Sequence, residues 1–357
     1  MTAINLKPEK MFEEMVNFNQ KLAEGIKNLK ELGPISTGVT PKEVVYTEDK
    51  LQLQHFIPAE GKKPTNKTPL LVVYALVNRH YMTDIQEDRS TIKGLMETGQ
   101  DIYVIDWGYP DRSDRYLTLD DYINGYIDRC VDFICEKHGL DKINILGICQ
   151  GGTFCLCYTS THQEKINSLT TMVTPVDFKT DKNLLSKWVQ HVDIDKLVDA
   201  MGNISGDNLN STFLNMNPYS LMLQKYVDMV DIMNDPIKLK NFMRMEKWIF
   251  DSPDQAGEAY RQFIKECFQE NRLIKGTLVI GDKKIDLKNI KCPVLNVYAE
   301  KDHQVPPEAS KALSGATGSK DYNELTFNSG HIGIYVSGRA NKEIPPAIGK
   351  WLSEKSK

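Results

Sequence analysis

The residues of this chain that are best suited to covalent chemistry lie in the segment Gly147-Ile-Cys-Gln-Gly151. The segment has the G-x-S-x-G pattern of a nucleophile elbow, with Cys149 in the position of the serine. Such an elbow is a tight strand-to-helix turn, and its neighbours must lack a Cβ atom so that the turn does not clash with the flanking strands. The N-terminus of the following helix favours a thiolate. We therefore predict that Cys149 is a nucleophile and that the Gln150 N–H donates to a developing oxyanion.

A cysteine nucleophile needs a base, and the base needs a group that orients it. In chains with this elbow, an acid and then a histidine follow the nucleophile, on loops after late strands. Asp302 follows the apolar run 294–299, and His331 lies between glycines just after the next run. We predict that His331 is the base and that Asp302 orients it. Glu300 competes with Asp302 for this role, and His303 competes with His331.

The second oxyanion donor of such an elbow usually comes from the loop after the third strand. In this chain the backbone N–H of Val77 or of Asn78 has that position. Asp106 and Trp107 end the next strand, and we predict that they form a wall of the same pocket. An equally good interpretation is that they form an ordinary strand-end turn with an aromatic residue packed against it. The other cysteines lack the spacing of zinc ligands, so we predict no metal.

Composition narrows the class of protein. The chain has 357 residues, of which 41% are apolar and 26% are charged, as in ordinary soluble globular proteins. Its net charge of −4 argues against nucleic acid as the main partner. The longest apolar run, 70–77, is too short to span a bilayer, and the first ten residues lack the apolar stretch of a secretory signal. The 7 cysteines are an odd number, which suits a reducing cytoplasm.

The apolar pattern predicts the elements that position these residues. Apolar residues between 11 and 29 recur at spacings of three and four, which predicts a helix in an N-terminal segment, 1–35. Its apolar stripe is expected to pack on the body of the protein, with docking to a partner as the alternative. Strands and helices then alternate, which predicts a mostly parallel, doubly wound sheet with right-handed crossovers. The predicted elements are a hairpin over 44–57, strands at 70–74, 102–105, 143–146 and 169–173, and helices at 85–98, 119–138 and 153–158.

Between 176 and 290 the alternation stops and the pattern is helical, with predicted helices at 182–201, 218–233, 236–250 and 254–270. Seven of the 13 methionines lie between Met201 and Met245, which suits either an adaptable apolar surface or a buried helical core. Strands resume at 294–299 and 325–327, and we predict that Pro345-Pro346 opens a last helix that ends near Trp351. The sequence therefore predicts an α/β-hydrolase fold. Its core is 36–175 and 291–357, and a helical cap, 176–290, is inserted after the sixth strand.

At this point the chain resembles a known family, the polyhydroxyalkanoate synthases, and specifically the short class III catalytic subunit. The resemblance covers nearly the whole chain, and the absence of the long N-terminal domain of class I and II synthases favours class III. It implies that Cys149, Asp302 and His331 match the catalytic cysteine, aspartate and histidine of the family. The most specific segments are 74–79, 101–110, 147–151, 172–178 and 330–335.

The resemblance also implies a reaction and its partners. The substrate would be a short (R)-3-hydroxyacyl-CoA, such as 3-hydroxybutyryl-CoA, and the product a polyester chain held in cytoplasmic granules. A second, non-catalytic E-type subunit is implied, in a homo- or hetero-oligomer. CoA would be the leaving group, with no organic or metal cofactor. Cysteine suits this chemistry because the acyl group stays a thioester on the enzyme. Its later transfer to a hydroxyl forms an oxygen ester and is favourable in free energy.

Two alternatives remain from the sequence. The first is a cysteine hydrolase that acts on esters or lactones, as in the dienelactone hydrolases, although these lack a cap of this size. The second is a granule-surface scaffold without enzymatic activity, which the intact Cys149, Asp302 and His331 argue against.

Overall fold

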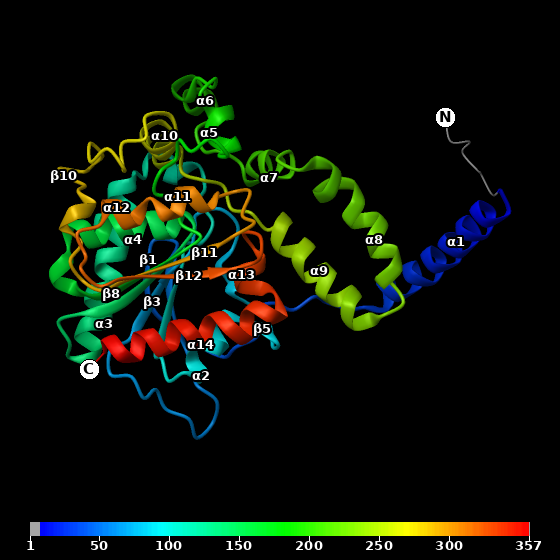
Figure 1. Cartoon of the computed structure of the whole chain (residues 1–357), viewed down its shortest axis with the longest axis horizontal. Helices are drawn as coiled ribbons and strands as arrows, with labels where there is room; N and C mark the ends of the chain where they lie inside the picture. Colours follow the sequence, from blue (N-terminus) through cyan, green and yellow to red (C-terminus); the bar gives the residue numbers. More distant parts are fainter. Residues whose placement is uncertain (1–7, 357) are drawn as a thin grey trace. The chain divides into compact units, whose positions relative to one another are not determined.

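The central element of this computed structural model, which describes residues 8–356, is an eight-stranded sheet (Figure 1). Its strands follow the order β1-β2-β6-β3-β7-β8-β11-β12. Strands β1 and β2 form the predicted hairpin, β2 is antiparallel to β6, and all other neighbours are parallel. The predicted mostly parallel sheet is therefore present. The strands are β1 (Lys42–Glu48), β2 (Leu51–Phe56), β3 (Leu70–Val73), β6 (Ile102–Asp106), β7 (Ile143–Ile148), β8 (Ile166–Met172), β11 (Val294–Ala299) and β12 (Tyr322–Phe327).

Helices cover both faces of this sheet. Helices α2 (Thr91–Glu97) and α14 (Gly338–Lys355) pack together on one face. Helices α4 (Gln150–Thr161), α11 (Pro307–Lys311) and α12 (Leu313–Ala316) lie on the other face, above the sheet in Figure 1. Every residue of β3, β6, β7 and β11 is buried, as expected for strands covered on both sides.

The predicted helix over 85–98 is wrong in its first half, because two short strands precede it. The Asp84 carboxylate accepts hydrogen bonds from the Thr40 N–H at 2.8 Å and from the Ser90 hydroxyl at 2.6 Å. The Ser90 side chain also accepts from the Lys93 N–H at 2.9 Å, and so caps α2. These polar contacts hold the segment in an extended form until Thr91. The short strands are β4 (Asp84–Gln86) and β5 (Arg89–Ser90).

The start of the last helix also differs from the prediction, since both prolines lie inside α14 and do not open it. The helix begins at Gly338, where the Ser337 side chain accepts from the Ala340 N–H at 3.2 Å. Gly94 of α2 leaves the space that the Pro345 ring fills, because a Cβ atom at Gly94 would lie 2.8 Å from that ring. Packing against α2 therefore compensates for Pro345, a residue that normally interrupts a helix.

The segment between β8 and β11 is helical, as predicted, and the predicted helix over 236–250 is present with the same bounds. The other three predicted helices are shorter, and each consists of two successive elements. Residues 182–201 form two helices, because Asp193 caps the second one through the Lys196 N–H. The segment also contains helix α7 and a small hairpin that the sequence did not indicate. Its elements are α5 (Leu184–Val189), α6 (Ile194–Met201), α7 (Gly206–Leu214), η5 (Tyr219–Gln224), α8 (Lys225–Ile232), α9 (Pro236–Phe250), α10 (Gly257–Gln262), η6 (Phe263–Gln269), β9 (Val279–Ile280) and β10 (Lys283–Lys284).

The remaining elements connect these layers. The long predicted helix over 119–138 begins with a π-helical turn, η3, and continues as α3. The remaining elements are η1 (His80–Thr83), η2 (Arg112–Tyr116), η3 (Asp121–Ile127), α3 (Asp128–His138), η4 (Gln163–Lys165), η7 (Leu287–Asn289) and α13 (Gly333–Val336).

The chain forms two compact units whose boundaries differ from the predicted domains. The smaller unit consists of Met1–Ser36 and Asn210–Asp251, and the larger unit contains the rest. In the smaller unit, α1 (Pro8–Glu31) packs against α8 and α9 around Val230, Met233 and Leu239. The two ends of the predicted cap meet beside α4, where Phe154 and Phe178 each contact Phe263 edge-on. The role of 176–290 as a cap therefore stays a prediction, and this segment is not a separate compact unit.

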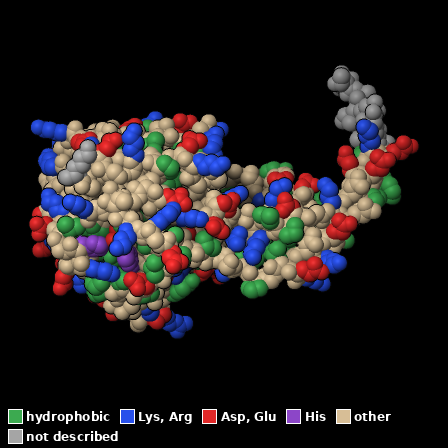
Figure 2. Space-filling view, turned by 90° about the horizontal axis from the view of Figure 1, so that it is seen from below, with side chains coloured by type: hydrophobic (Ala, Val, Ile, Leu, Met, Phe, Trp, Pro, Cys, Tyr) green, Lys and Arg blue, Asp and Glu red, His purple; other side chains and the backbone are tan. Residues whose placement is uncertain are grey.

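The apolar stripe of α1 is only half covered. Leu22 and Leu29 pack in the core of the smaller unit, whereas Met11, Phe12 and Met15 remain exposed. On the face shown in Figure 2, basic and acidic side chains are interspersed, in keeping with the net charge of −4. Among residues 8–356, none of the helices combines the length and apolar composition that crossing a membrane requires.

Candidate active site

Cys149 lies at a strained turn between β7 and α4. Its backbone has φ 55° and ψ −124°, and α4 begins at the next residue. A residue other than glycine seldom adopts a positive φ, so this conformation marks a position where the surrounding structure imposes strain. Gly151 permits it, because a Cβ atom there would overlap the Val73 carbonyl oxygen and lie 2.7 Å from the Tyr74 carbonyl oxygen. The elbow geometry that the sequence predicted is therefore present.

Asp302 and His331, predicted on loops after β11 and β12, lie together beside this turn. His331 Nδ1 is 2.6 Å from Asp302 Oδ2, and both residues are buried. Asp302 Oδ1 accepts hydrogen bonds from the N–H groups of Gln304 at 2.9 Å and Val305 at 2.8 Å, which fix the carboxylate. Cys149 is close enough to the His331 imidazole to act on its pKa. Because Asp302 occupies Nδ1, Nε2 is the nitrogen that faces the sulfur.

The charges around His331 favour its protonated form. Burial by itself lowers the pKa of this imidazole, but the charges of Asp302 and Cys149 and the hydrogen bonds to both raise it more. The net effect raises the pKa of His331 to about 10. At neutral pH an imidazolium therefore lies between a carboxylate and the sulfur, an arrangement that stabilises a thiolate nucleophile.

A stability measurement tests this protonation state. Because the pKa of His331 is higher in the folded protein than its ordinary value of 6.5, the proton stabilises the fold fully below pH 6.5. This stabilisation is lost as the pH rises through about 10. We expect the free energy of unfolding to fall between pH 7 and pH 10 by more in the wild-type protein than in His331→Gln, measured by denaturant unfolding under reducing conditions. Parallel curves for the two proteins would contradict a raised pKa.

The two competing residues take no part in the contact between Asp302 and His331. The His303 side chain is exposed, and Asp302 directs its second oxygen to backbone N–H groups and not to His303. Glu300 is also exposed, and its carboxylate accepts from the Thr326 hydroxyl at 3.3 Å. The structure therefore brings Asp302 and His331 to Cys149, and does not bring Glu300 there.

The other cysteines lack these features. All 7 cysteines are free thiols. Burial raises the pKa of the Cys157 thiol to about 12 and that of Cys292 to about 11, and it also raises the pKa of Cys130, Cys155 and Cys267. Only their protonated forms are present at neutral pH, and a thiol is a poor nucleophile. Within residues 8–356 no cluster of His, Cys, Asp and Glu has the arrangement that a metal needs.

Two backbone N–H groups remain available beside Cys149. Gln150 is the first residue of α4, so its N–H has no partner within the helix. The Leu76 N–H donates to Gln150 Oε1 at 3.0 Å, which ties this loop to the elbow. The next N–H, that of Val77, has no acceptor in the described part of the chain. Asn78 has φ 57° and shapes the turn that follows. The Gln150 and Val77 N–H groups are thus the better-placed pair for an oxyanion, and this assignment stays a prediction.

Asp106 and Trp107 hold the loop that carries Val77. Asp106 Oδ2 is 2.8 Å from Arg79 Nη2, and Arg79 Nη1 donates to the Gly108 carbonyl at 2.9 Å. The Trp107 indole N–H donates to the Tyr74 carbonyl oxygen at 2.9 Å. These groups are committed to the loop, so they hold the segment that carries the predicted oxyanion donor. Direct contact between these two residues and a substrate stays a prediction.

A pair of buried tyrosines beside the nucleophile was not predicted from the sequence. The Tyr74 and Tyr335 hydroxyls are 3.2 Å apart, and their rings pack edge-on. Burial raises the pKa of both, and the nearby Cys149 raises it further, so both phenols stay protonated. One of the two hydroxyl protons joins the pair. The only signal in the sequence was their location, at the end of a strand and four residues after His331.

Two family models match the chain. Residues 68–337 match a model described as the alpha/beta hydrolase fold, and residues 9–95 match the N-terminus of poly-beta-hydroxybutyrate polymerase (PhaC). A monoacylglycerol lipase of Paleococcus ferrophilus has a similar structure, with a TM-score of 0.51 and 18% sequence identity, over 81% of this chain and 96% of the lipase. The predicted fold class is thereby confirmed.

Curated relatives match over almost the entire chain. One is the poly(3-hydroxyalkanoate) polymerase subunit PhaC of Allochromatium vinosum, 62% identical over 355 residues, which are 99% of this chain and 100% of the relative. The subunit of the same name from Thiocystis violacea is 63% identical over 356 residues and 100% of both chains. That of Synechocystis sp. is 52% identical over 97% of this chain and 94% of the relative.

Proposed function

The chain belongs to the poly(3-hydroxyalkanoate) polymerase family, and from this premise we propose that it builds a polyester through an acyl thioester on Cys149. The substrate is an (R)-3-hydroxyacyl-CoA, in the first place 3-hydroxybutyryl-CoA. The observation that carries the mechanism is the His331 imidazole, which Asp302 holds at 2.6 Å and which lies next to a cysteine at a strained elbow.

In the first half-reaction the Cys149 thiolate attacks the carbonyl carbon of the CoA thioester. The Gln150 and Val77 N–H groups stabilise the negative charge on the carbonyl oxygen. The intermediate collapses by breaking the bond to the CoA sulfur, which takes the proton from His331 and leaves as a thiol. Because one thioester replaces another, this step conserves the reactivity of the acyl group.

In the second half-reaction the 3-hydroxyl of another 3-hydroxyacyl group attacks the carbonyl carbon bound to Cys149. The neutral His331 takes the hydroxyl proton, and the Cys149 thiolate leaves as the oxygen ester forms. The imidazolium–thiolate pair is thereby restored. The buried Tyr74–Tyr335 pair fills space next to the sulfur, which helps to keep water away from the acyl-enzyme.

The two alternatives predict different products. A cysteine hydrolase would use the same Cys149, His331 and Asp302 but pass the acyl group to water, whereas a scaffold would leave the substrate unchanged. The names of the curated relatives favour polymerisation.

We propose that full activity needs a second subunit of the E type. The relatives are named as polymerase subunits, and exposed Met11, Phe12 and Met15 offer an apolar surface for such a contact. We propose that this activity takes place in the cytoplasm, at the surface of polyester granules.

One assay tests both proposals. Incubated with 3-hydroxybutyryl-CoA, the chain is expected to release free thiol and to produce turbid polymer, with a lag that the E-type subunit shortens. The same assay with the subunit alone is the control. Thiol released with free 3-hydroxybutyrate would indicate a hydrolase, and neither product with the subunit present would indicate a scaffold. Lag-free polymerisation by the isolated chain at low concentration would contradict the need for a partner.

A further inference from the structure

We propose that the loop 109–116 binds the nucleotide end of CoA, the 3′-phosphoadenosine diphosphate group of the substrate. The inference rests on the proposed function, because it assumes that the acyl donor is a CoA thioester. We call residues 109–116 the nucleotide loop. It contains two aromatic side chains, Tyr109 and Tyr116, and two arginines, Arg112 and Arg115.

The nucleotide loop lies at the same edge of the sheet as Cys149. It directly follows β6, and β6 is parallel to β3 and separated from β7 by that strand alone. The carboxyl ends of these strands therefore meet at one edge. Trp107, just before the loop, donates to the Tyr74 carbonyl oxygen, and that oxygen also lies against Gly151 of the elbow. The long pantetheine arm of CoA can thus join a nucleotide at the loop to a thioester at the sulfur.

The nucleotide loop is held rigidly, with its acidic side chains already paired. Lys50 forms ion pairs with Asp111 at 2.6 Å and with Asp114. The Asp111 side chain accepts from the Ser113 N–H at 2.7 Å, and the Asp114 side chain accepts from the Asp111 N–H at 2.7 Å. Both carboxylates of the loop therefore already have hydrogen-bond and ion-pair partners. A preorganised loop loses little conformational entropy when a ligand binds.

The two arginines of the loop, by contrast, have no acidic partner within residues 8–356. Arg112 is exposed, and the Arg115 guanidinium lies 5.0 Å from the ring centre of Tyr116. Guanidinium groups bind phosphates in a bidentate manner, and CoA carries a diphosphate and a 3′-phosphate. The loop therefore presents two free cations to an anionic substrate, although the whole chain has a net charge of −4.

The aromatic side chains of the loop are unusually open. Tyr109 is 51% exposed and Tyr116 is 68% exposed. The Arg79 guanidinium lies over the Tyr109 ring at 4.2 Å, so this ring already has a cation on one side. Exposed aromatic rings and guanidinium planes are the surfaces on which nucleobases stack. An adenine base fits this composition better than an acyl chain does.

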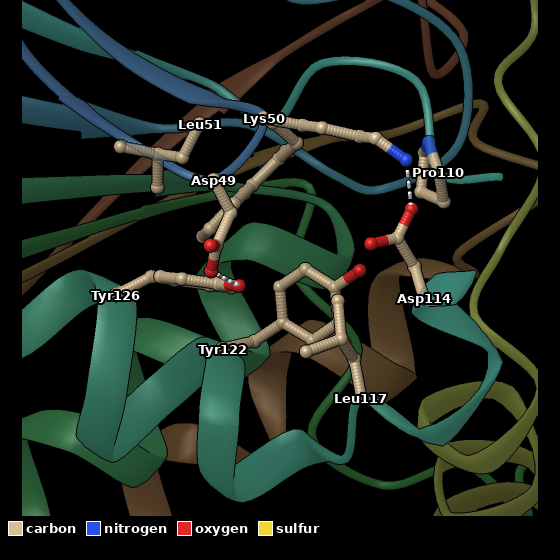
Figure 3. A pocket seen from close by; sticks show the side chains of 9 residues that line it. Asp49, Lys50, Leu51, Pro110, Asp114, Leu117, Tyr122 and Tyr126 are labelled. Carbon is tan, nitrogen blue, oxygen red and sulfur yellow. Dashed lines mark hydrogen bonds and ion pairs between the residues drawn. The ribbon is translucent and has the colours of Figure 1, made fainter.

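A hollow adjoins the loop (Figure 3). Pro110 and Asp114 of the loop form part of its wall, opposite Tyr122 and Tyr126. The Tyr122 side chain is 3% exposed, and its hydroxyl has no hydrogen-bond partner in the described part of the chain. This hydroxyl can therefore donate a hydrogen bond to a polar group in the hollow. The hollow is lined by Asp49, Lys50, Leu51, Trp107, Pro110, Asp114, Leu117, Tyr122 and Tyr126.

Two thioesters of the same acyl group test the proposal. 3-Hydroxybutyryl-CoA carries the nucleotide, whereas the 3-hydroxybutyryl thioester of N-acetylcysteamine lacks it. In the double variant Arg112→Gln, Arg115→Gln we expect kcat/KM for the CoA thioester to fall about tenfold or more, because hydrogen bonds to charged groups are lost. With the truncated thioester we expect a change of less than about twofold. Adenosine 3′,5′-bisphosphate should compete with the CoA thioester in the wild-type protein and lose affinity by a similar factor in the variant.

The matched control is Lys62→Gln, Lys63→Gln, which removes two exposed charges before β3, at the opposite edge of the sheet. It should leave both substrates unaffected. The proposal is overturned if the arginine variant loses the same factor with both thioesters, or if it loses nothing with the CoA thioester. Failure of the wild-type protein to make polymer from either thioester would contradict the proposed function itself. In that case binding of adenosine 3′,5′-bisphosphate to wild type and variant, measured by calorimetry, still decides the role of the loop.

Discussion

Replacing Cys149 by alanine is expected to reduce both CoA release and polymer formation by a factor of about 10⁴ or more, because no other residue forms the acyl thioester. The effect is this large because the groups at such a site act as a unit, so that loss of the nucleophile removes the contribution of His331 and Asp302 as well. The measurement is free thiol and turbidity with 3-hydroxybutyryl-CoA in the presence of the E-type subunit.

The control for this variant is Cys135→Ala. Cys135 lies on α3, and burial raises the pKa of its thiol, so its loss should change the rate by less than about twofold. Cys149→Ser tests the chemistry of the sulfur while it keeps a side chain of similar shape at the turn. An alcohol is a weaker nucleophile and would hold the acyl group as an oxygen ester. We expect this variant to be acylated slowly and to stall. Substantial polymer from Cys149→Ala would show that the acyl group is carried elsewhere.

Replacing Asp302 by asparagine is expected to impair polymer elongation far more than acylation of Cys149. Asp302 holds Nδ1 of His331 and, with Cys149, raises the pKa of the imidazole. A thiolate attacks without a base, whereas a hydroxyl must lose its proton to His331 during the attack. Loss of the equivalent carboxylate in a serine triad reduces kcat by about 10⁴. We expect a loss of that order for elongation and a loss of about tenfold to a hundredfold for acylation.

Rapid-quench measurement of CoA release, followed by mass analysis of the acyl-enzyme, separates the two steps. Asp302→Asn should show a burst of CoA and then short chains on the protein, and His331→Gln should fail severely at elongation. Glu300→Gln is the matched control, since it removes an exposed carboxylate two residues away and should change neither step. Equal losses of acylation and elongation in Asp302→Asn would mean that both steps need the oriented base equally. The proposal that elongation depends on His331 as a base far more than acylation does would then be wrong.

The parts of the site that could be predicted from the sequence are those with local signals. The glycines around Cys149 mark the elbow, because the turn leaves no room for side chains. Asp302 and His331 each follow an apolar run at a strand end, and the family order of nucleophile, acid and histidine selects them. Glu300 and His303 are close enough in sequence to compete, and only the structure, in which Asp302 contacts His331 at 2.6 Å, rules them out.

The parts that could not be predicted depend on contacts between distant segments. Tyr74 and Tyr335 are 261 residues apart and meet only after the sheet has formed. Asp106 resembles a turn residue until Arg79 is placed beside it. Likewise, Pro345 normally indicates a helix start, and only packing against Gly94 of α2 makes it tolerable in a helix interior. The packing of α1 with residues 210–251 has the same long-range origin.

The central claim, that Cys149 carries the growing acyl group as a thioester, has one direct test. A reaction of the complete enzyme with 3-hydroxybutyryl-CoA is quenched in acid within milliseconds, digested, and examined by mass spectrometry. We predict that the peptide containing Cys149 gains one or more 3-hydroxybutyryl units, and that hydroxylamine at neutral pH removes them, as it does from a thioester. Acyl groups found only on other peptides, or no acyl-enzyme while CoA is being released, would contradict the mechanism.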